Sequence, residues 1–351
     1  MQQRNYRVPF YLLVLTLGLT CPPEGFAARR GASLTLVKTT QLRKPAGHVH
    51  QVVPVPGGGL IVRDSDFHDE KTQVAELYSD AGYYCGQFGS FGHGPGQYYR
   101  LKSVAVGSDQ TVWLADIIGR ISRFDMEGRL VSTRLLQRPG YQVDWMVLDE
   151  PRATYYLAGY LPKKIYIDHG NSLIHKYRLG DDAFNRSYLD NHEEVLWYNL
   201  TSLADVNFDA DARGRLYVVD APIMKLTLLE PESGNASTFP VESDVITPVS
   251  PIGSGKEAAE KAYTDSHLID RVLVGDAHVL LSIRRPREEG FLLQIFDHAG
   301  RQLASDVPSP GQLVGKTADG HFYFARRSGE GFELAEYEVT PAARRAQTVT
   351  R

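Results

Sequence analysis

The densest cluster of side chains able to bind a metal ion lies between residues 64 and 70. There Asp64, Asp66 and His68 alternate along the chain. Carboxylate oxygens and imidazole nitrogens bind divalent cations, so these three residues are the candidate metal ligands. The segment has neither the spacing of a calcium-binding loop nor that of a zinc motif. We therefore expect a solvated acidic loop and no cofactor, with a divalent-metal site as the alternative.

Two other segments combine aromatic rings with charged groups, which suits the binding of a carbohydrate or a peptide. The first contains Tyr98 and Arg100, just after a glycine-rich turn. The second contains His192, Trp197 and Tyr198. We predict these five residues as ligand contacts. For the second segment the alternative is a short helix whose tryptophan packs between structural repeats.

The glycine-rich turn is similar to a phosphate-binding loop only in its glycines. Gly92, Gly94 and Gly96 are not followed by the Lys-Ser/Thr pair of that loop or by a helical pattern, so we do not expect nucleotide binding. The sequence also has no nucleophile elbow, metal triad or paired-carboxylate motif, and its 11 histidines are scattered. It thus favours a non-catalytic binding or scaffold module that recognises a protein, peptide or glycan. A metal-dependent lactonase or lyase, whose residues would come from several repeats, is the alternative.

The elements that position these residues recur along the chain. Six apolar runs follow polar turns at intervals of 43 to 63 residues, and their nearly continuous hydrophobicity predicts strands covered on both faces. Another strand, a turn such as Asp125 to Gly128 and a more polar strand follow each run. The apolar runs are aligned on Leu60, Val112, Tyr155, Leu216, Val279 and Phe322.

Six sets of about four strands predict an all-β fold, a six-bladed β-propeller of four-stranded antiparallel blades. Residues 28–351 are expected to form this single domain. The strand-like segment 32–41 is favoured as the strand that closes the ring, because it has more β-branched residues and leucine than the alternative, the tail 344–351. The blades are expected near residues 50–89, 98–136, 141–189, 203–240, 267–307 and 310–340.

Residues 91–131 carry the repeat in its clearest form, FGHGPGQYYRLKSVAVGSDQTVWLADIIGRISRFDMEGRLV. This segment resembles an NHL repeat, whose copies run Phe-Gly, a glycine-rich turn, Gly-Gln-Phe, a Val-Ala-Val strand, a Val-Ala-Asp strand and a Phe-Asp-x-x-Gly turn. The match is good over this blade, fair in blades one and four, and only topological in the other three. The terminal Asp of the second strand is missing at Gly159, Ile283 and Arg326. The resemblance implies a propeller and no particular activity.

The connections between strands divide unequally between the two ends of such a propeller. Turns from first to second strands are short, whereas connections at the opposite end, such as 88–100 and 239–267, are long. Long loops on a rigid scaffold commonly carry binding sites, so we place the ligand on this end, the long-loop face. Asp116 and Asp220, which end second strands there, are expected to accept hydrogen bonds from loop amides.

The N-terminal residues predict export. Arg4 and Arg7 precede an apolar run, 10–19, that is too short to cross a bilayer, and residues 25–27 place small side chains where a signal peptidase cleaves. We expect residues 1–27 to be a signal peptide and the mature chain to be periplasmic or secreted. Cys21 lacks the sequence context of a lipoprotein cysteine.

The composition argues against nucleic-acid binding and against a membrane-spanning helix in the mature chain. The formal net charge of -4 over 351 residues gives no basic footprint for nucleic acid. After residue 27 no stretch is apolar enough for a membrane-spanning helix, so no integral membrane segment is expected in the mature chain.

Overall fold

The structure is a computed structural model. It describes residues 32–43, 48–66, 69–136, 142–160, 172–190, 206–220, 223–247, 257, 261, 264–288, 290–329 and 331–341. Within these residues, none of the helices has both the length and the apolar character needed to cross a bilayer. The predicted signal peptide and its cleavage site lie outside them.

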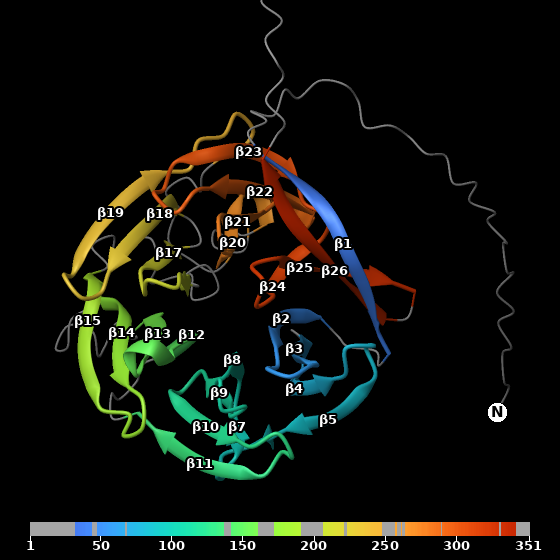
Figure 1. The fold of residues 1–351 in the computed structure, drawn as a ribbon, viewed down its shortest axis with the longest axis vertical. Coiled ribbons are helices and arrows are strands. Elements are labelled where there is room, and N and C mark those ends of the chain that lie inside the picture. Colours follow the sequence, from blue (N-terminus) through green and yellow to red (C-terminus); the bar gives the residue numbers. More distant parts are fainter. Residues whose placement is uncertain are drawn as a thin grey trace, which may run out of the picture.

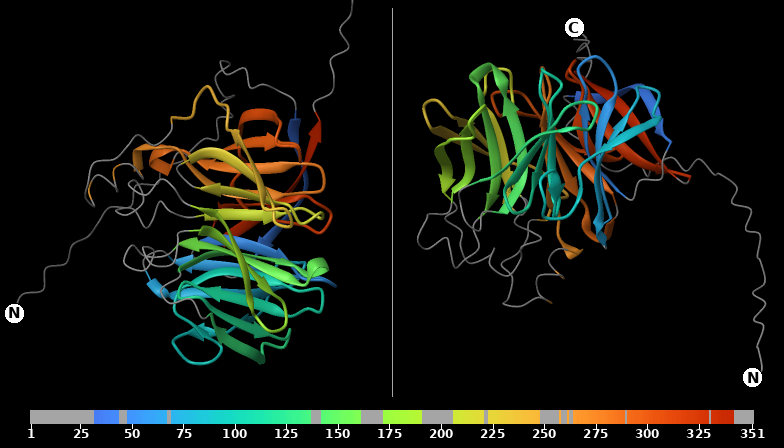
Figure 2. Two further views of the ribbon diagram at one scale, coloured as in Figure 1. Left: turned by 90° about the vertical axis from the view of Figure 1, so that its left-hand side faces the viewer. Right: turned by 90° about the horizontal axis from the view of Figure 1, so that it is seen from below.

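The described strands form six antiparallel blades around a central axis (Figure 1). Side views show the strands of each blade running between the two ends of the ring (Figure 2). The predicted all-β, six-bladed propeller is therefore confirmed. Blade one contains β2 (Val49–Pro54), β3 (Leu60–Asp66), β4 (Asp69–Tyr78) and β5 (Tyr84–Phe88), and blade two contains β8 (Leu101–Val106), β9 (Val112–Asp116), β10 (Arg120–Phe124) and β11 (Leu130–Leu135).

The next three blades repeat this order from the axis outward. Blade three contains β12 (Gln142–Asp149), β13 (Thr154–Tyr160), β14 (Ser172–Arg178) and β15 (Phe184–Asp190). Blade four contains β16 (Val206–Ala210), β17 (Leu216–Asp220), β18 (Ile223–Glu230) and β19 (Asn235–Pro240). Blade five contains β20 (Leu268–Val274), β21 (Val279–Arg284), β22 (Phe291–Phe296) and β23 (Gln302–Pro308).

Blade six is completed by the N-terminal strand. It contains β24 (Gln312–Lys316), β25 (Phe322–Ser328), β26 (Gly331–Pro341) and, outermost, β1 (Ala32–Leu42). Strand β1 pairs antiparallel with β26 from Ala32 opposite Pro341 to Leu42 opposite Phe332, and the two run side by side in Figure 1. The strand favoured for closing the ring thus occupies the outer position of the last blade. The alternative segment, 344–351, lies outside the described residues.

The core lies between the blades. Each of the six hydrophobic clusters in the described part of the chain is shared by two neighbouring blades, and together the clusters run all the way round the ring. In β13, Tyr155 and Leu157 pack toward blade two, whereas Tyr156 and Ala158 pack toward blade four. Because successive side chains of a strand point to opposite faces, a strand between two blades needs apolar residues at consecutive positions. This explains the continuous apolar runs in the sequence.

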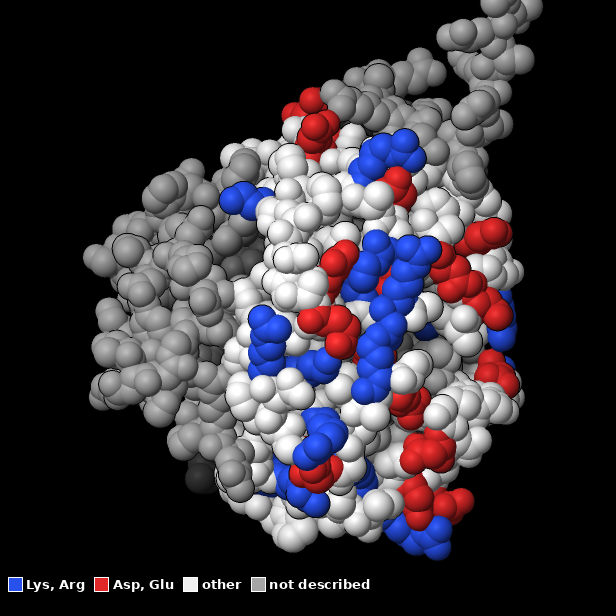
Figure 3. Space-filling view, turned by 60° about the vertical axis from the view of Figure 1, so that its left-hand side comes forward, with Lys and Arg blue, Asp and Glu red and all other residues white. Residues whose placement is uncertain are grey.

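Burial falls from the axis to the rim. All five residues of the second strand β9 are buried, whereas five of the six residues of the outermost strand β19 are exposed. Basic and acidic side chains are interspersed on the face drawn in Figure 3. Among the described residues, ion pairs also link outer strands and turns, so their charges are balanced locally. These pairs are Arg123–Asp182, Arg134–Asp182, Arg178–Asp181 and Lys176–Glu232.

The first and last blades are also joined at the axis. Val52 in β2 pairs in parallel with Gly315 in β24, which links blades one and six into a continuous eight-stranded sheet. A Cβ atom at position 315 would lie 2.1 Å from the carbonyl oxygen of Val52. Only glycine therefore allows the two backbones to approach this closely.

Replacing Gly315 with alanine is expected to separate these two strands. The clash is with backbone, which cannot move aside cheaply, so the free energy of unfolding should fall by about 1–3 kcal/mol in urea denaturation. Gly86→Ala is the matched control, because nothing lies within 4 Å of the added Cβ there. Equal stabilities for the two variants would contradict the close contact between blades one and six.

Candidate functional site

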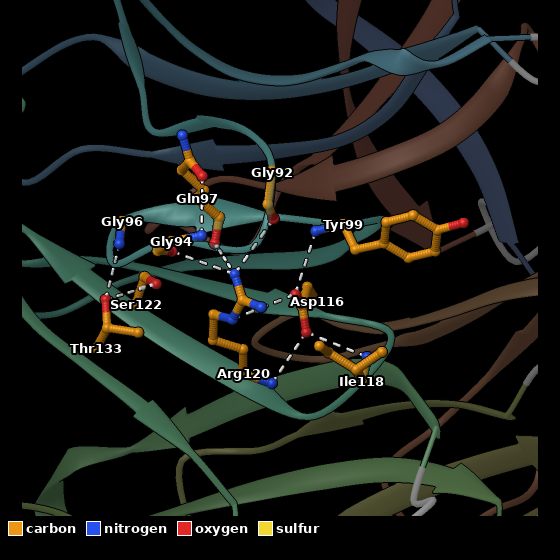
Figure 4. A network of polar contacts seen from close by, with 10 residues as sticks. All are labelled: Gly92, Gly94, Gly96, Gln97, Tyr99, Asp116, Ile118, Arg120, Ser122 and Thr133. Atoms are coloured by element: carbon orange, nitrogen blue, oxygen red, sulfur yellow. Dashed lines mark hydrogen bonds and ion pairs between the residues drawn. The ribbon is translucent and has the colours of Figure 1, made fainter.

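The glycine-rich connection between blades one and two is fixed in place by Arg120 of β10 (Figure 4). The Arg120 Nη1 group donates to the carbonyl oxygens of Gln97 at 2.8 Å and of Gly92 and Gly94 at 3.3 Å. The Gly94 amide in turn donates to the Gln97 side chain at 2.8 Å. A short parallel pair, β6 (Ser90–Phe91) with β7 (Gln97–Tyr98), completes the connection. These hydrogen bonds to backbone carbonyl and amide groups hold the connection in a single conformation.

A buried carboxylate holds the other side of the same connection. Asp116, at the end of β9, is 1% exposed and accepts hydrogen bonds from the backbone amides of Tyr99, Ile118 and Arg120 at 2.9–3.2 Å. Burial raises the pKa of Asp116, although these hydrogen bonds act in the opposite direction. The expected capping role of Asp116 is thus confirmed. The side chain of Asp220 lies outside the described residues.

The structure does not place Tyr98 as predicted, because its side chain is buried, whereas that of its neighbour Tyr99 is partly exposed. Tyr98 is 2% exposed and packs in the cluster between blades one and two, and burial raises the pKa of its hydroxyl group. A side chain buried in this way has no surface to offer a ligand. Tyr99 points the other way and is half-buried, because consecutive residues of an extended chain face opposite sides.

Tyr99 forms a small aromatic patch with His93 and Phe91. The Tyr99 and His93 rings are stacked, with centroids 5.3 Å apart and planes 20° apart, and the Phe91 centroid lies 5.8 Å from that of Tyr99. His93 is exposed, as is the predicted contact Arg100, the next residue after Tyr99. Ile118, which shares the Asp116 carboxylate with Tyr99, is 42% exposed. The four residues Phe91, His93, Tyr99 and Ile118 are called the aromatic patch below.

A second set of polar residues surrounds the channel at the same end of the ring. His50, Lys102, Asp144 and Asp270 each stand at a register shift near the start of an innermost strand. An extra residue in a strand leaves the ladder, and its side chain is re-aimed. Lys102 and Asp144, from neighbouring blades, form an ion pair at 3.2 Å, in which the Lys102 side chain is 26% exposed. We call these four residues the channel rim.

The remaining predicted site residues are placed only in part. Asp64, 7% exposed in β3, accepts a hydrogen bond from the His48 amide at 2.7 Å. The backbone of Asp66 stands opposite that of Asp69 in the pairing of β3 with β4. His68 lies outside the described residues. So do the three residues of the second aromatic segment, His192, Trp197 and Tyr198.

Metal binding by this loop stays a prediction. Among the residues that the structure describes, no group of three His, Cys, Asp or Glu side chains is arranged to hold a metal ion. The side chains of two of the three proposed ligands, Asp66 and His68, lie outside the described part of the structure, which therefore does not test the divalent-metal alternative.

The sequence places Tyr99 in the same segment as Tyr98 and Arg100 but does not show which of the two tyrosines is exposed, and it does not single out the channel rim. A signal for the rim was present, because a charged residue lies at the second or third position of three innermost strands that are otherwise mostly apolar, LKSVAV, QVDWMVLD and LIDRVLV. Which way such a side chain points depends on the register shift, and the register is set by pairing with the next strand.

Comparison with known proteins supports the architecture. No protein-family profile and no curated protein sequence matches this chain. Solved structures do match it, and these structures are propellers. The fold is that of a β-propeller. A protein from Bacteroides fragilis assigned as exported aligns at 11% identity with a TM-score of 0.61, over 88% of this chain and 95% of its own.

Two lyases are also similar in structure. Streptogramin B lyase has 8% identity and a TM-score of 0.50, over 88% of this chain and 98% of its own. Virginiamycin B lyase from Staphylococcus aureus has 12% identity and a TM-score of 0.51, over 88% of this chain and 89% of its own. At these identities the likeness concerns the fold alone. The NHL resemblance stays a prediction.

Removing the Asp116 carboxylate is expected to loosen the glycine-rich connection. In Asp116→Ala three backbone amides lose their acceptor, so the free energy of unfolding should fall by about 2 kcal/mol, and residues 89–100 should exchange amide hydrogen faster. Asp125→Ala is the control, since its carboxylate accepts the Glu127 and Arg129 amides in an exposed turn of the same blade. Similar losses in the two variants would show that burial of the Asp116 site has no special effect.

Proposed function

We propose that this chain is an exported, non-catalytic binding module that recognises a protein, peptide or glycan through its long-loop face. The stacked pair of His93 and Tyr99 carries the proposal. Its rings are partly exposed, and hydrogen bonds to Asp116 and Arg120 hold their backbone in place. A rigid aromatic surface binds a partner without a large loss of conformational entropy.

The surroundings of the rings supply polar recognition. Arg100, which follows Tyr99 in the chain, is exposed, and the channel rim contributes the Lys102–Asp144 ion pair between β8 and β12. Aromatic rings pack on apolar faces of sugars and peptides, while charged groups at their edge bond hydroxyl, carbonyl or carboxylate groups. A partner contacting both the aromatic patch and the channel rim would thus meet apolar and polar groups side by side.

Export is part of the proposal and rests mainly on residues 1–27. The arginines, the short apolar run and the small residues at 25–27 support it. The similar propeller from Bacteroides fragilis, itself assigned as exported, is in line with it. The two similar lyases support no activity here, because their identities are 8% and 12%.

The proposal predicts that Tyr99 is central to binding. The mature chain is screened on peptide and glycan arrays, and its best ligand is titrated against variants. We expect Tyr99→Ala and His93→Ala each to weaken affinity at least about tenfold, because aromatic anchors dominate such interfaces. Tyr83→Ala is the matched control and should bind normally, since Tyr83 is a 52% exposed tyrosine that follows the turn between β4 and β5, away from the aromatic patch.

Two results would contradict the proposal. Unchanged affinity in both Tyr99→Ala and His93→Ala would remove the aromatic patch from the interface. One equivalent of divalent metal in the purified chain, lost in Asp64→Ala together with a hydrolytic or lyase activity, would instead favour the metal-dependent lactonase or lyase.

A further inference from the structure

A cavity of about 410 Å³ lies inside the ring, at the end opposite the long-loop face. Its walls come from the later halves of the innermost strands of all six blades and from the turns that follow them. Exposed residues of these turns, Ala212 and Ala318, belong to its lining, so the cavity reaches the surface at this end. Its volume falls in the range of small-molecule sites.

Most of the wall is apolar. Val53, Val106, Met146 and Leu273 are among the lining residues, each from a different blade. Toward the long-loop face the channel is filled, because Arg271 of blade five reaches Trp145 of blade three. Its guanidinium carbon lies 4.2 Å from the centroid of the Trp145 ring, and Arg271 is 4% exposed. The cavity is thus a pocket with mostly apolar walls that is closed toward the long-loop face and open at the other end.

Two ion pairs lie at the open end, and in both the cation is the accessible partner. Arg152, in the short helix η1 (Glu150–Arg152), pairs with Asp149 at 2.9 Å; their side chains are 28% and 4% exposed. Lys316 pairs with Asp209 at 2.6 Å, and the side chains of the two residues are 32% and 8% exposed.

The third acidic residue of the lining, Asp211, is 3% exposed and pairs with Arg215 at 2.7 Å. The ammonium group of Lys316 already donates to Asp209 and to the carbonyl oxygens of Val274 and Ala210, so Lys316 offers a ligand its charge, whereas Arg152 also offers N–H groups.

The carboxylate of Asp209 is already fully engaged by the protein. Its oxygens accept the Ala210 amide at 2.9 Å, the Val274 amide at 2.8 Å and the Lys316 ammonium group. Lys316 thereby connects blade six to blades four and five, so its position is fixed. A cationic ligand would find no free carboxylate oxygen on Asp209.

Arg152 is the better donor to a ligand. Its Nη1 group donates to Asp149, which leaves other N–H groups of the five that a guanidinium carries. The guanidinium packs against Gly214 of the next blade, where an added Cβ would lie 2.3 Å from its central carbon. The group is therefore held in place at the rim of the cavity, and a planar guanidinium matches a carboxylate in shape.

We propose that this cavity binds a small amphipathic anion that has one carboxylate group and an apolar chain or ring. The apolar part lies against the valine and methionine walls, and the carboxylate bonds to Arg152 and faces Lys316. The site is at the other end of the ring from the long-loop face and does not depend on the function proposed for that face.

Isothermal titration calorimetry with octanoate tests this proposal on the mature chain. We expect one octanoate per chain. Octanol and octylamine have the same apolar tail and should bind at least tenfold more weakly, because octanol lacks the charge and octylamine carries the opposite one. The comparison separates recognition of the carboxylate from simple hydrophobic uptake.

Variants locate the site. Arg152→Met keeps the apolar stem and should weaken octanoate binding at least tenfold, while Arg152→Lys should retain part of it. Ala318→Trp adds bulk at an exposed rim position that can accept it without disturbing the core, and it should abolish binding. Arg301→Met is the control and should bind like the parent, since Arg301 is 77% exposed and pairs with Asp297 outside the cavity.

Several outcomes would overturn the proposal. They are no saturable octanoate binding at millimolar concentration, equal binding of octanol, or normal binding by the Ala318→Trp variant. Circular dichroism melts confirm that each variant is folded, so that a loss of binding reports on the site.

Discussion

The constraint on which this structure depends is that each blade has two flat apolar faces and can bury both only between two other blades. The six core clusters are accordingly shared between neighbours. Full burial of one valine, leucine or phenylalanine side chain contributes about 1.5–3 kcal/mol, so an unpaired face would be very costly. The first and last blades must therefore be joined, and they are joined through β1 on β26 and through Val52 beside Gly315.

A closed ring leaves its two ends free to differ. At the long-loop end, the side chains of Arg120 and Asp116 form hydrogen bonds with backbone groups of the glycine-rich connection, in place of the strand pairing that it lacks. These hydrogen bonds hold the backbone of Tyr99 in a fixed position. At the other end the connections are short turns, and charged side chains cross between blades that are not neighbours, as Lys316 does to Asp209. The two proposed binding sites, on the loops and in the channel, thus lie on different parts of one scaffold.

The fold was largely predictable from the sequence, whereas the site was only partly so. The second strand of a propeller blade is buried on both faces, so it must be apolar at consecutive positions. Runs such as Val112 to Ala115 therefore locate the second strand of every blade in the sequence. Which of Tyr98 and Tyr99 faces outward depends on the register of a two-residue strand. The orientation of Lys102 and Asp144 depends on register shifts. The orientations of these side chains thus depend on pairing between strands, and they cannot be predicted from the composition or residue spacing of one segment.

Hydrogen–deuterium exchange across β1 tests the closed ring most directly. The account predicts that the β1 amides bonded to β26 exchange much more slowly than those of an unstructured chain, because β1 is paired along its length as the outer strand of the last blade. Exchange of β1 at the rate of an unstructured chain, with β26 still protected, would contradict it.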